Sequence, residues 1–190
     1  MTKYILHGGF TKIDNDSNRT FFRELVLDVP DGGSILMVHF ASRNENPMQD
    51  FDIMKSKIRA EAANKNLNFV YATKEDFVTQ IKAADAVYIS GGSTNKLLEV
   101  LRSYEVLQPL LEGKTVAGSS AGAYAIAKLG ASHSEDVMRE GMGWAPLRVI
   151  CHYESSELPP APGAVQLLLQ SSLDLELVIL RDCECKVFRF

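Results

Sequence analysis

Short runs of apolar and β-branched residues recur along this chain, and the gaps between them are mostly long enough to hold a helix. The runs predicted to be strands are Lys3–Leu6, Ser34–Phe40, Leu67–Tyr71, Ala86–Ile89, Thr115–Ala117, Arg148–Cys151 and Leu175–Leu180. Several are apolar almost throughout, which is typical of a parallel sheet covered on both faces. Strand–helix alternation therefore predicts a three-layer, doubly wound, flavodoxin-like α/β fold with a mostly parallel sheet.

Length and composition fit a single domain over residues 1–190. The chain has 190 residues, of which 46% are hydrophobic and 23% charged, so it can bury a substantial core. We find no internal repeat and no interdomain linker. A net charge of −4 argues against nucleic acid or an anionic membrane as the main partner. No apolar run approaches the roughly 20 residues that span a bilayer.

The N-terminus and the cysteines indicate a cytoplasmic protein. The first residues lack the apolar segment and the cleavage site of a signal peptide. Three cysteines are an odd number, and a chain of this length needs no disulfide framework. Cys183 and Cys185 could form half of a metal site, but no second cluster completes it. We therefore expect neither a metal nor another cofactor.

The segment Val116–Ala123 is predicted to be a buried strand that turns sharply into a helix. Gly118, Ser120 and Gly122 match the pattern Gly-x-Ser-x-Gly, in which small residues let the backbone bend and lift the serine hydroxyl above the sheet. The N–H of Ala121, at the start of the helix, would then face an oxyanion beside that serine. A glycine-rich turn without any chemistry would have a similar composition.

Other glycine-rich turns should lie close to Ser120, because ligands of doubly wound sheets bind beyond the carboxyl ends of the strands. Gly8 and Gly9 follow the first predicted strand, and Gly91 and Gly92 follow the fourth. The N–H of Gly91 or Gly92 is a candidate second donor to an oxyanion. A phosphate-binding turn is the alternative, but the chain has neither the dinucleotide-binding nor the P-loop spacing.

A serine nucleophile needs a base, and the chain has four histidines. His152 is the best candidate because it ends a predicted strand on the same rim as Ser120. His7 ends the first strand, and His133 lies in a polar loop. His39 lies within an apolar strand and is interpreted as a satisfied core residue.

The base in turn needs a carboxylate to orient it. Asp136, in the loop region after the predicted helix that follows Ser120, is the first choice. Asp182 and Glu184, beside the last strand, are the alternatives, and a site without a third member also stays open.

The motifs also occur in a characteristic order and spacing. The stretches concerned are Val87–Arg102, Gly118–Ala123, and Gly141–Trp144 leading to Cys151–Tyr153. Together they resemble the peptidase E and cyanophycinase family of serine peptidases, which has the class I glutamine-amidotransferase-like fold. The resemblance covers most of the chain.

This resemblance implies roles for the candidate residues. Ser120 would be the nucleophile and His152 the general base. The family implies an oxyanion hole formed by the amides of Gly91 or Gly92 and of Ala121, and an acid at Asp136 or, near the last strand, at Asp182 or Glu184. No metal or other cofactor is implied.

The chain departs from the family after His152. Family members usually carry arginines there that can bind an acidic substrate group, but Glu154–Gln170 contains neither arginine nor lysine. Arg139, Arg148 and Arg181 are the cations that could replace them. The preferred substrate side chain therefore stays open.

We expect a serine peptidase that hydrolyses short peptides, as a dipeptidase does, through an acyl-enzyme intermediate. The partner is a small peptide substrate, and the chain is expected to be a monomer or a homodimer. One alternative is an esterase of the α/β-hydrolase type, which Gly-x-Ser-x-Gly favours but the position of His152 in the chain does not. The other is a catalytically inactive, amidotransferase-like binding module.

Overall fold

The strands form two sheets in the computed structural model, which describes residues 1–190. The first sheet has the order β10-β1-β5-β4-β2-β3, with β10 antiparallel to β1 and all other pairs parallel. Its strands are β1 (Lys3–His7), β2 (Ser34–Val38), β3 (Asn68–Tyr71), β4 (Ala86–Ile89), β5 (Thr115–Ser119) and β10 (Cys185–Arg189). The predicted α/β class with mostly parallel pairing is confirmed.

The second sheet has the order β7-β6-β8-β9, and only β7 is antiparallel to its neighbour. Its strands are β6 (Ala127–Ala131), β7 (Met138–Glu140), β8 (Ala145–Ile150) and β9 (Glu176–Ile179). The sequence predicts a helix that continues to Leu129, but the helix ends at Ile126 and the chain goes on as β6. Pairing of β6 with β7 and β8 overrides the local helical pattern there.

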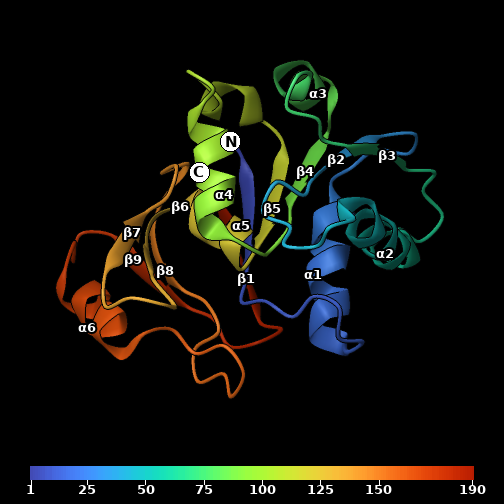
Figure 1. Ribbon diagram of the computed structural model, residues 1–190. Helices are drawn as coiled ribbons and strands as arrows, with labels where there is room; N and C mark the ends of the chain where they lie inside the picture. Colours follow the sequence, from blue (N-terminus) through green and yellow to red (C-terminus); the bar gives the residue numbers. More distant parts are fainter.

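Helices cover both faces of the first sheet (Figure 1). The helical elements are α1 (Asp16–Leu27), α2 (Pro47–Ala60), α3 (Phe77–Ala83), α4 (Thr94–Arg102), the 3-10 helix η1 (Gln108–Leu111), α5 (Ala121–Ile126) and α6 (Pro162–Gln170). On one face, α1 and α2 bury Phe21, Leu25, Met54 and Ile58 against the sheet. On the other face, α3, α4 and α5 share a core with β8 and β9 of the second sheet. One continuous core therefore joins the two sheets.

The parallel strands of the first sheet end in a row of polar residues. His7 pairs with Ser119 across β1 and β5. The next pairs, Ile89 with Gly118 and Val38 with Ile89, place Ser90 beside Ser119 and His39 beside Ser90. These residues, His7, Ser119, Ser90 and His39, are all buried and are called the polar row below. Side chains alternate along a strand, so the row points to the face that α1 and α2 cover.

No helix of the structure combines the length and the apolar character that crossing a membrane requires.

Candidate active site

Ser120 lies at the sharp turn between β5 and α5, with φ 50° and ψ −105°. A non-glycine residue rarely adopts a positive φ, and such strain costs about 1–3 kcal/mol. The flanking glycines make the turn possible. A Cβ on Gly118 would lie 2.4 Å from the carbonyl carbon of Gly122, and one on Gly122 would lie 2.3 Å from the Ile89 oxygen. Any larger residue at either position would push α5 away from the sheet.

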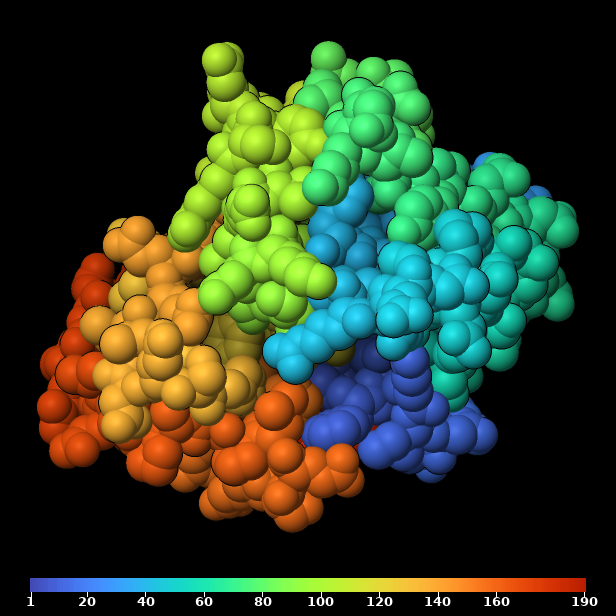
Figure 2. All heavy atoms as spheres, viewed as in Figure 1, coloured from blue at the N-terminus to red at the C-terminus, as the bar shows by residue number.

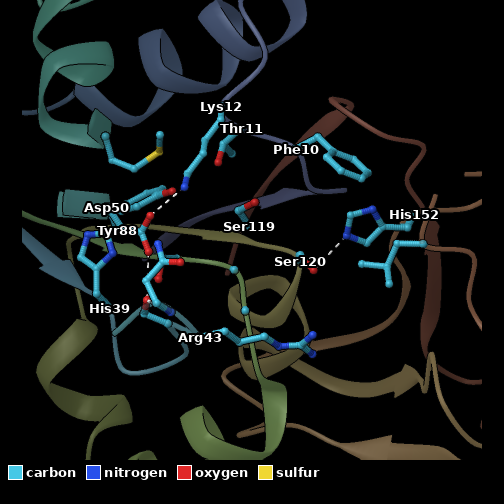
Figure 3. Close-up of a pocket in the computed structure, with 17 residues that line it drawn as sticks. Phe10, Thr11, Lys12, His39, Arg43, Asp50, Tyr88, Ser119, Ser120 and His152 are labelled. Carbon is cyan, nitrogen blue, oxygen red and sulfur yellow. Dashed lines mark hydrogen bonds and ion pairs between the residues drawn. The ribbon is translucent and has the colours of Figure 1, made fainter. Parts of the chain in front are cut away.

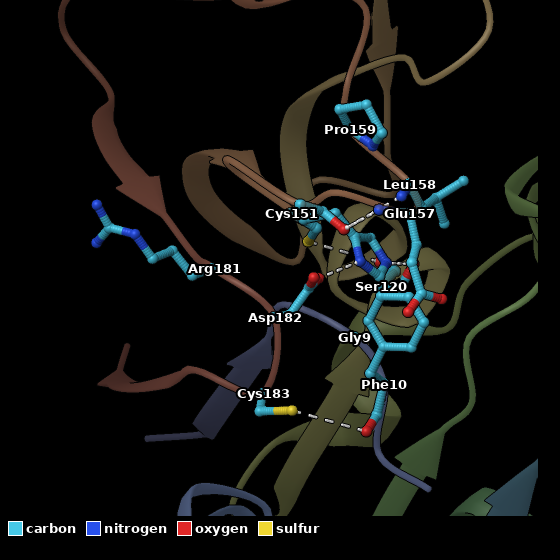
Figure 4. A network of polar contacts seen from close by, with 12 residues as sticks. Gly9, Phe10, Ser120, Cys151, Glu157, Leu158, Pro159, Arg181, Asp182 and Cys183 are labelled. Atoms are coloured by element: carbon cyan, nitrogen blue, oxygen red, sulfur yellow. Dashed lines mark hydrogen bonds and ion pairs between the residues drawn. The ribbon is translucent and has the colours of Figure 1, made fainter. Parts of the chain in front are cut away.

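His152 connects Ser120 to a carboxylate. Its Nε2 lies 3.0 Å from Ser120 Oγ, and its Nδ1 lies 2.6 Å from Asp182 Oδ1 (Figures 3 and 4). His152 follows β8 and Asp182 follows β9, so neighbouring parallel strands of the second sheet deliver both groups. Because Nδ1–H donates to the carboxylate, Nε2 is left as the acceptor for the serine hydroxyl.

Burial lowers the pKa of His152 below 6.5, and the hydrogen bond and charge of Asp182 oppose this shift without cancelling it. The imidazole is therefore neutral at pH 7, which is the state a base needs.

The ring of His152 is held on several sides. A Cβ on Gly9 would lie 2.0 Å from His152 Cε1, so the main chain of Gly9 packs directly against the ring. The ring of Phe10 meets it edge-on, with centroids 5.1 Å apart, and that of His133 lies 5.3 Å away. This packing fixes the orientation that both hydrogen bonds of His152 require.

Asp136, the first choice of acid from the sequence, does not contact His152. Its Oδ1 accepts a hydrogen bond of 2.7 Å from the N–H of Gly163, at the start of α6, where a carboxylate stabilises the helix N-terminus. Glu184 accepts a hydrogen bond from the N–H of Arg181 instead. The choice of Asp136 is therefore corrected, because the carboxylate beside His152 belongs to the alternative, Asp182.

The predicted oxyanion donors lie around Ser120. A Cβ on Gly91 would lie 3.4 Å from Ser120 Cβ, so the main chain of Gly91 borders the serine directly. Neither Gly91 nor Gly92 donates a main-chain hydrogen bond to the rest of the backbone. Ala121 opens α5, and the first N–H groups of a helix have no partner within it.

The remaining histidines have separate environments. His7 is buried, its Nε2 lies 2.8 Å from Asn18 Oδ1, and its Nδ1 accepts a hydrogen bond from the N–H of Gly9. Burial lowers the pKa of His7 to about 4. His39 lies just beyond the end of β2 and is buried, but neither of its ring nitrogens has a hydrogen-bond partner. Its interpretation as a satisfied core residue is therefore wrong.

Two hollows open on either side of Ser120. The first hollow, of about 320 Å³, extends from His152 and Ser120 to His39 and Asp50 (Figure 3). The second hollow, of about 290 Å³, extends from Ser120 to His133. Figure 2 shows the surface indented where segments from the first half of the chain, in cyan and green, meet the orange segments that follow β6. A peptide lying across Ser120 could place one part in each hollow.

Cations proposed from the sequence lie in different places. Arg148 is buried and donates to the carbonyls of Leu168, Ser171 and Leu175, so it holds α6 to the second sheet. Arg181 pairs with Glu154 at 2.7 Å. Arg139 lines the second hollow, where it pairs with Glu135 at 3.1 Å.

Arg43 was not predicted from the sequence. It lines both hollows and forms no ion pair. It follows β2 at the same rim as Gly91 and Ser120, so the position of its strand is the signal that could have found it.

Comparison with protein families shows which family the chain belongs to. Peptidase family S51 matches residues 9–185. The chain belongs to this family. The S51 peptidase is thus a serine peptidase that hydrolyses peptide bonds, and the resemblance to peptidase E stated from the sequence is confirmed. Family membership favours this activity over that of an esterase or an inactive binding module.

Solved structures share the fold of this S51 peptidase. A peptidase from an acI-B1 Actinobacterium is 22% identical with a TM-score of 0.70, and the match covers 100% of this chain and 84% of that one. A candidate peptidase E protein from Listeria monocytogenes EGD-e is 16% identical with a TM-score of 0.63, covering 100% of this chain and 99% of that one. A comparison with curated proteins gave no match.

Proposed function

We propose that this S51 peptidase hydrolyses short peptides through Ser120, His152 and Asp182. The observation that carries the proposal is the unbroken chain of hydrogen bonds from Ser120 Oγ through the imidazole to Asp182 Oδ1. This is the arrangement by which a base activates a serine and a carboxylate orients the base.

The reaction follows from these contacts. His152 Nε2 takes the hydroxyl proton as Ser120 Oγ attacks the peptide carbonyl, and Asp182 stabilises the imidazolium that forms. The N–H groups of Gly91 or Gly92 and of Ala121 bind the oxyanion of the tetrahedral intermediate. His152 then gives the proton to the leaving amine. Water, activated by the same imidazole, hydrolyses the acyl-enzyme and restores the serine.

A dipeptidase-like preference is supported by Arg43. Its guanidinium has no carboxylate partner, and it lines both hollows beside Ser120. In the second hollow, it can pair with the free C-terminal carboxylate of a short substrate. A longer peptide would carry an uncharged amide at that point and would lose this pairing.

Labelling with a fluorophosphonate probe tests the nucleophile. The wild-type protein should take up the probe, and Ser120→Ala should not. The variant should also lose peptide hydrolysis by at least about 10³-fold. A folded wild-type protein that takes up no probe, or a Ser120→Ala variant that still takes it up, would show that Ser120 is not the nucleophile.

Matched substrates test the preference for dipeptides. Dileucine should be hydrolysed with a lower KM than dileucine amide, which lacks the free carboxylate. Arg43→Gln should raise the KM for dileucine about tenfold and leave that for the amide unchanged. Equal effects on the two substrates would contradict carboxylate recognition by Arg43, although peptide hydrolysis itself would stand.

A further inference from the structure

We infer that the His39 end of the first hollow binds an uncharged substrate side chain that both donates and accepts hydrogen bonds, namely the carboxamide of asparagine or glutamine. The inference rests on the proposed function, because the hollow that contains His39 also contains Ser120. It assigns a substrate class to a site whose side-chain preference the sequence leaves open.

Two residues of the polar row, His7 and Ser119, have hydrogen-bond partners and are called the satisfied half. The other two, Ser90 and His39, have none and are called the unsatisfied half. His7 is bonded to Asn18 and Gly9, and Ser119 Oγ lies 3.4 Å from His7 Nδ1. In contrast, the Nδ1 and Nε2 of His39 and the Oγ of Ser90 have no partner within the protein. Leaving buried polar atoms unpaired costs stability. Both residues of the unsatisfied half line the first hollow, where a ligand can supply the missing partners.

Packing holds the ring of His39 in place for such a ligand. It is 3% exposed and stacks on Tyr71, with centroids 5.9 Å apart and planes 3° from parallel. Phe51 meets it edge-on at 6.2 Å. A ring fixed in this way presents its nitrogens without losing rotational freedom on binding.

The charge around His39 favours a neutral ligand. Lys12 pairs with Asp50 at 2.7 Å, and Ser42 donates a second hydrogen bond to the same carboxylate. Burial lowers the pKa of His39 to about 4, so the imidazole is uncharged at pH 7 and offers one donor and one acceptor. Lys12 and Asp50 already pair with each other, so neither offers a free counter-charge to an acidic or a basic side chain.

Arg43 does not change the charge around His39, because its guanidinium lies toward the other end of the first hollow. Its guanidinium points away from His39 (Figure 3). Burial is the main cause of the lowered pKa of His133, and the charge of Arg43 adds to it, whereas the charges that act on His39 are those of Asp50 and Lys12.

A carboxamide fits these partners. Its NH₂ group can donate to the imidazole nitrogen that lacks a proton, and its oxygen can accept from Ser90 or from the protonated nitrogen. Leucine has a similar shape but would leave all three atoms unpaired. A site with buried hydrogen-bonding groups rejects an analogue that cannot pair with them.

Dipeptides that differ in one side chain test the inference. Asparagine, aspartate and leucine are compared at each position of a dipeptide whose other residue is alanine, and kcat/KM is measured at pH 7. At one position, asparagine should exceed both aspartate and leucine by about tenfold or more. His39→Phe keeps the aromatic stacking but removes the nitrogens, so it should abolish the advantage of asparagine over leucine. His39→Gln and Ser90→Ala should each keep part of the advantage of asparagine over leucine.

Probe labelling of Ser120 separates the possible failures. If wild type is labelled and hydrolyses dipeptides but prefers leucine or aspartate, or if His39→Phe keeps the preference for asparagine, the inference is overturned while the proposed function stands. If wild type is neither labelled nor active, the proposed function itself fails. Thermal unfolding checks that each variant is folded. His39→Phe should be at least as stable as wild type, because it removes two unpaired buried nitrogens.

Discussion

At the scale of single residues, the hydrogen bond between Asp182 and His152 decides which imidazole nitrogen faces the serine. The carboxylate binds Nδ1–H at 2.6 Å, so the tautomer with a free Nε2 is favoured. An amide in place of the carboxylate could present its NH₂ group to Nδ1 and stabilise the wrong tautomer. Asp136 has no such influence, because it binds the N–H of Gly163.

Asp182→Asn should therefore lower kcat by about 10³–10⁴-fold, with little change in fold. Asp136→Asn is the matched control and should leave kcat unchanged, since asparagine caps a helix about as well as aspartate. Steady-state kinetics and circular dichroism of the two variants check this. If Asp136→Asn lost activity and Asp182→Asn kept it, the acid would be Asp136, in the loop between β6 and β7.

The pH profile should report the lowered pKa of His152. The base must be neutral, so kcat/KM should fall as the pH falls, with a midpoint below 6.5 because burial disfavours the imidazolium. Asp182 raises this pKa, so in the residual activity of Asp182→Asn the midpoint should move to still lower pH. An acid limb centred above pH 6.5 would mean that burial does not dominate at His152.

At the scale of elements, the turn from β5 into α5 sets the position of Ser120, the proposed nucleophile. The tightest contacts at the turn are between main chains, because Gly118 lies against Gly122 and Gly122 against Ile89 of β4. The serine is therefore placed by the close approach of α5 to the sheet and not by its own side-chain contacts.

Gly122→Ala should push α5 away from β4, since the new methyl carbon would lie 2.3 Å from the Ile89 oxygen. We expect a loss of about 1–3 kcal/mol in the free energy of unfolding and at least a 10²-fold loss of kcat. Gly113→Ala is the control, because open space surrounds Gly113 and only its φ of 76° is strained. It should lose about 1 kcal/mol of stability but no activity.

Elements that carry strong local patterns were predictable from the sequence. The parallel strands, the sharp turn at Ser120 and the position of His152 all follow from apolar runs and glycine spacing, because each depends on residues close together in the chain. The division into two sheets was not predictable, since β6 forms only through pairing with β7 and β8. Asp182 was only an alternative to Asp136 in the sequence analysis for the same reason. A loop carboxylate has no local pattern, and only the packing of distant strands brings Asp182 rather than Asp136 to the imidazole.

At the scale of the whole molecule, the site is shared between the two sheets. Ser120 follows a strand of the first sheet, whereas His152 and Asp182 follow strands of the second. Tyr124 of α5 links the two parts, because its hydroxyl accepts a hydrogen bond of 3.1 Å from the N–H of Cys151. If the proposed site is the active one, we expect activity to depend on how the second sheet docks against α5.

Tyr124→Phe should leave the buried N–H of Cys151 unpaired, next to the base. We expect a loss of about 1–3 kcal/mol in the free energy of unfolding and about a tenfold loss of kcat. Tyr104→Phe is the control, since it also removes a tyrosine hydroxyl bonded to the main chain, at Lys74, but on an exposed part of the surface. Equal losses of kcat in the two variants would contradict a role for the docking of the second sheet.

The residues packed around the imidazole of His152 would still enclose its place if the ring were removed. Gly9, Phe10 and His133 surround the ring of His152 without being covalently part of it, so His152→Ala should leave a slot of the same shape, with Asp182 still at one end. Free imidazole added to this variant should enter the slot and restore hydrolysis, with a rate that saturates as its concentration rises. 2-Methylimidazole should restore less, because the contact with Gly9 leaves no room at the carbon between the two nitrogens. The variant would then bind free imidazole in the place of the side chain that it lacks.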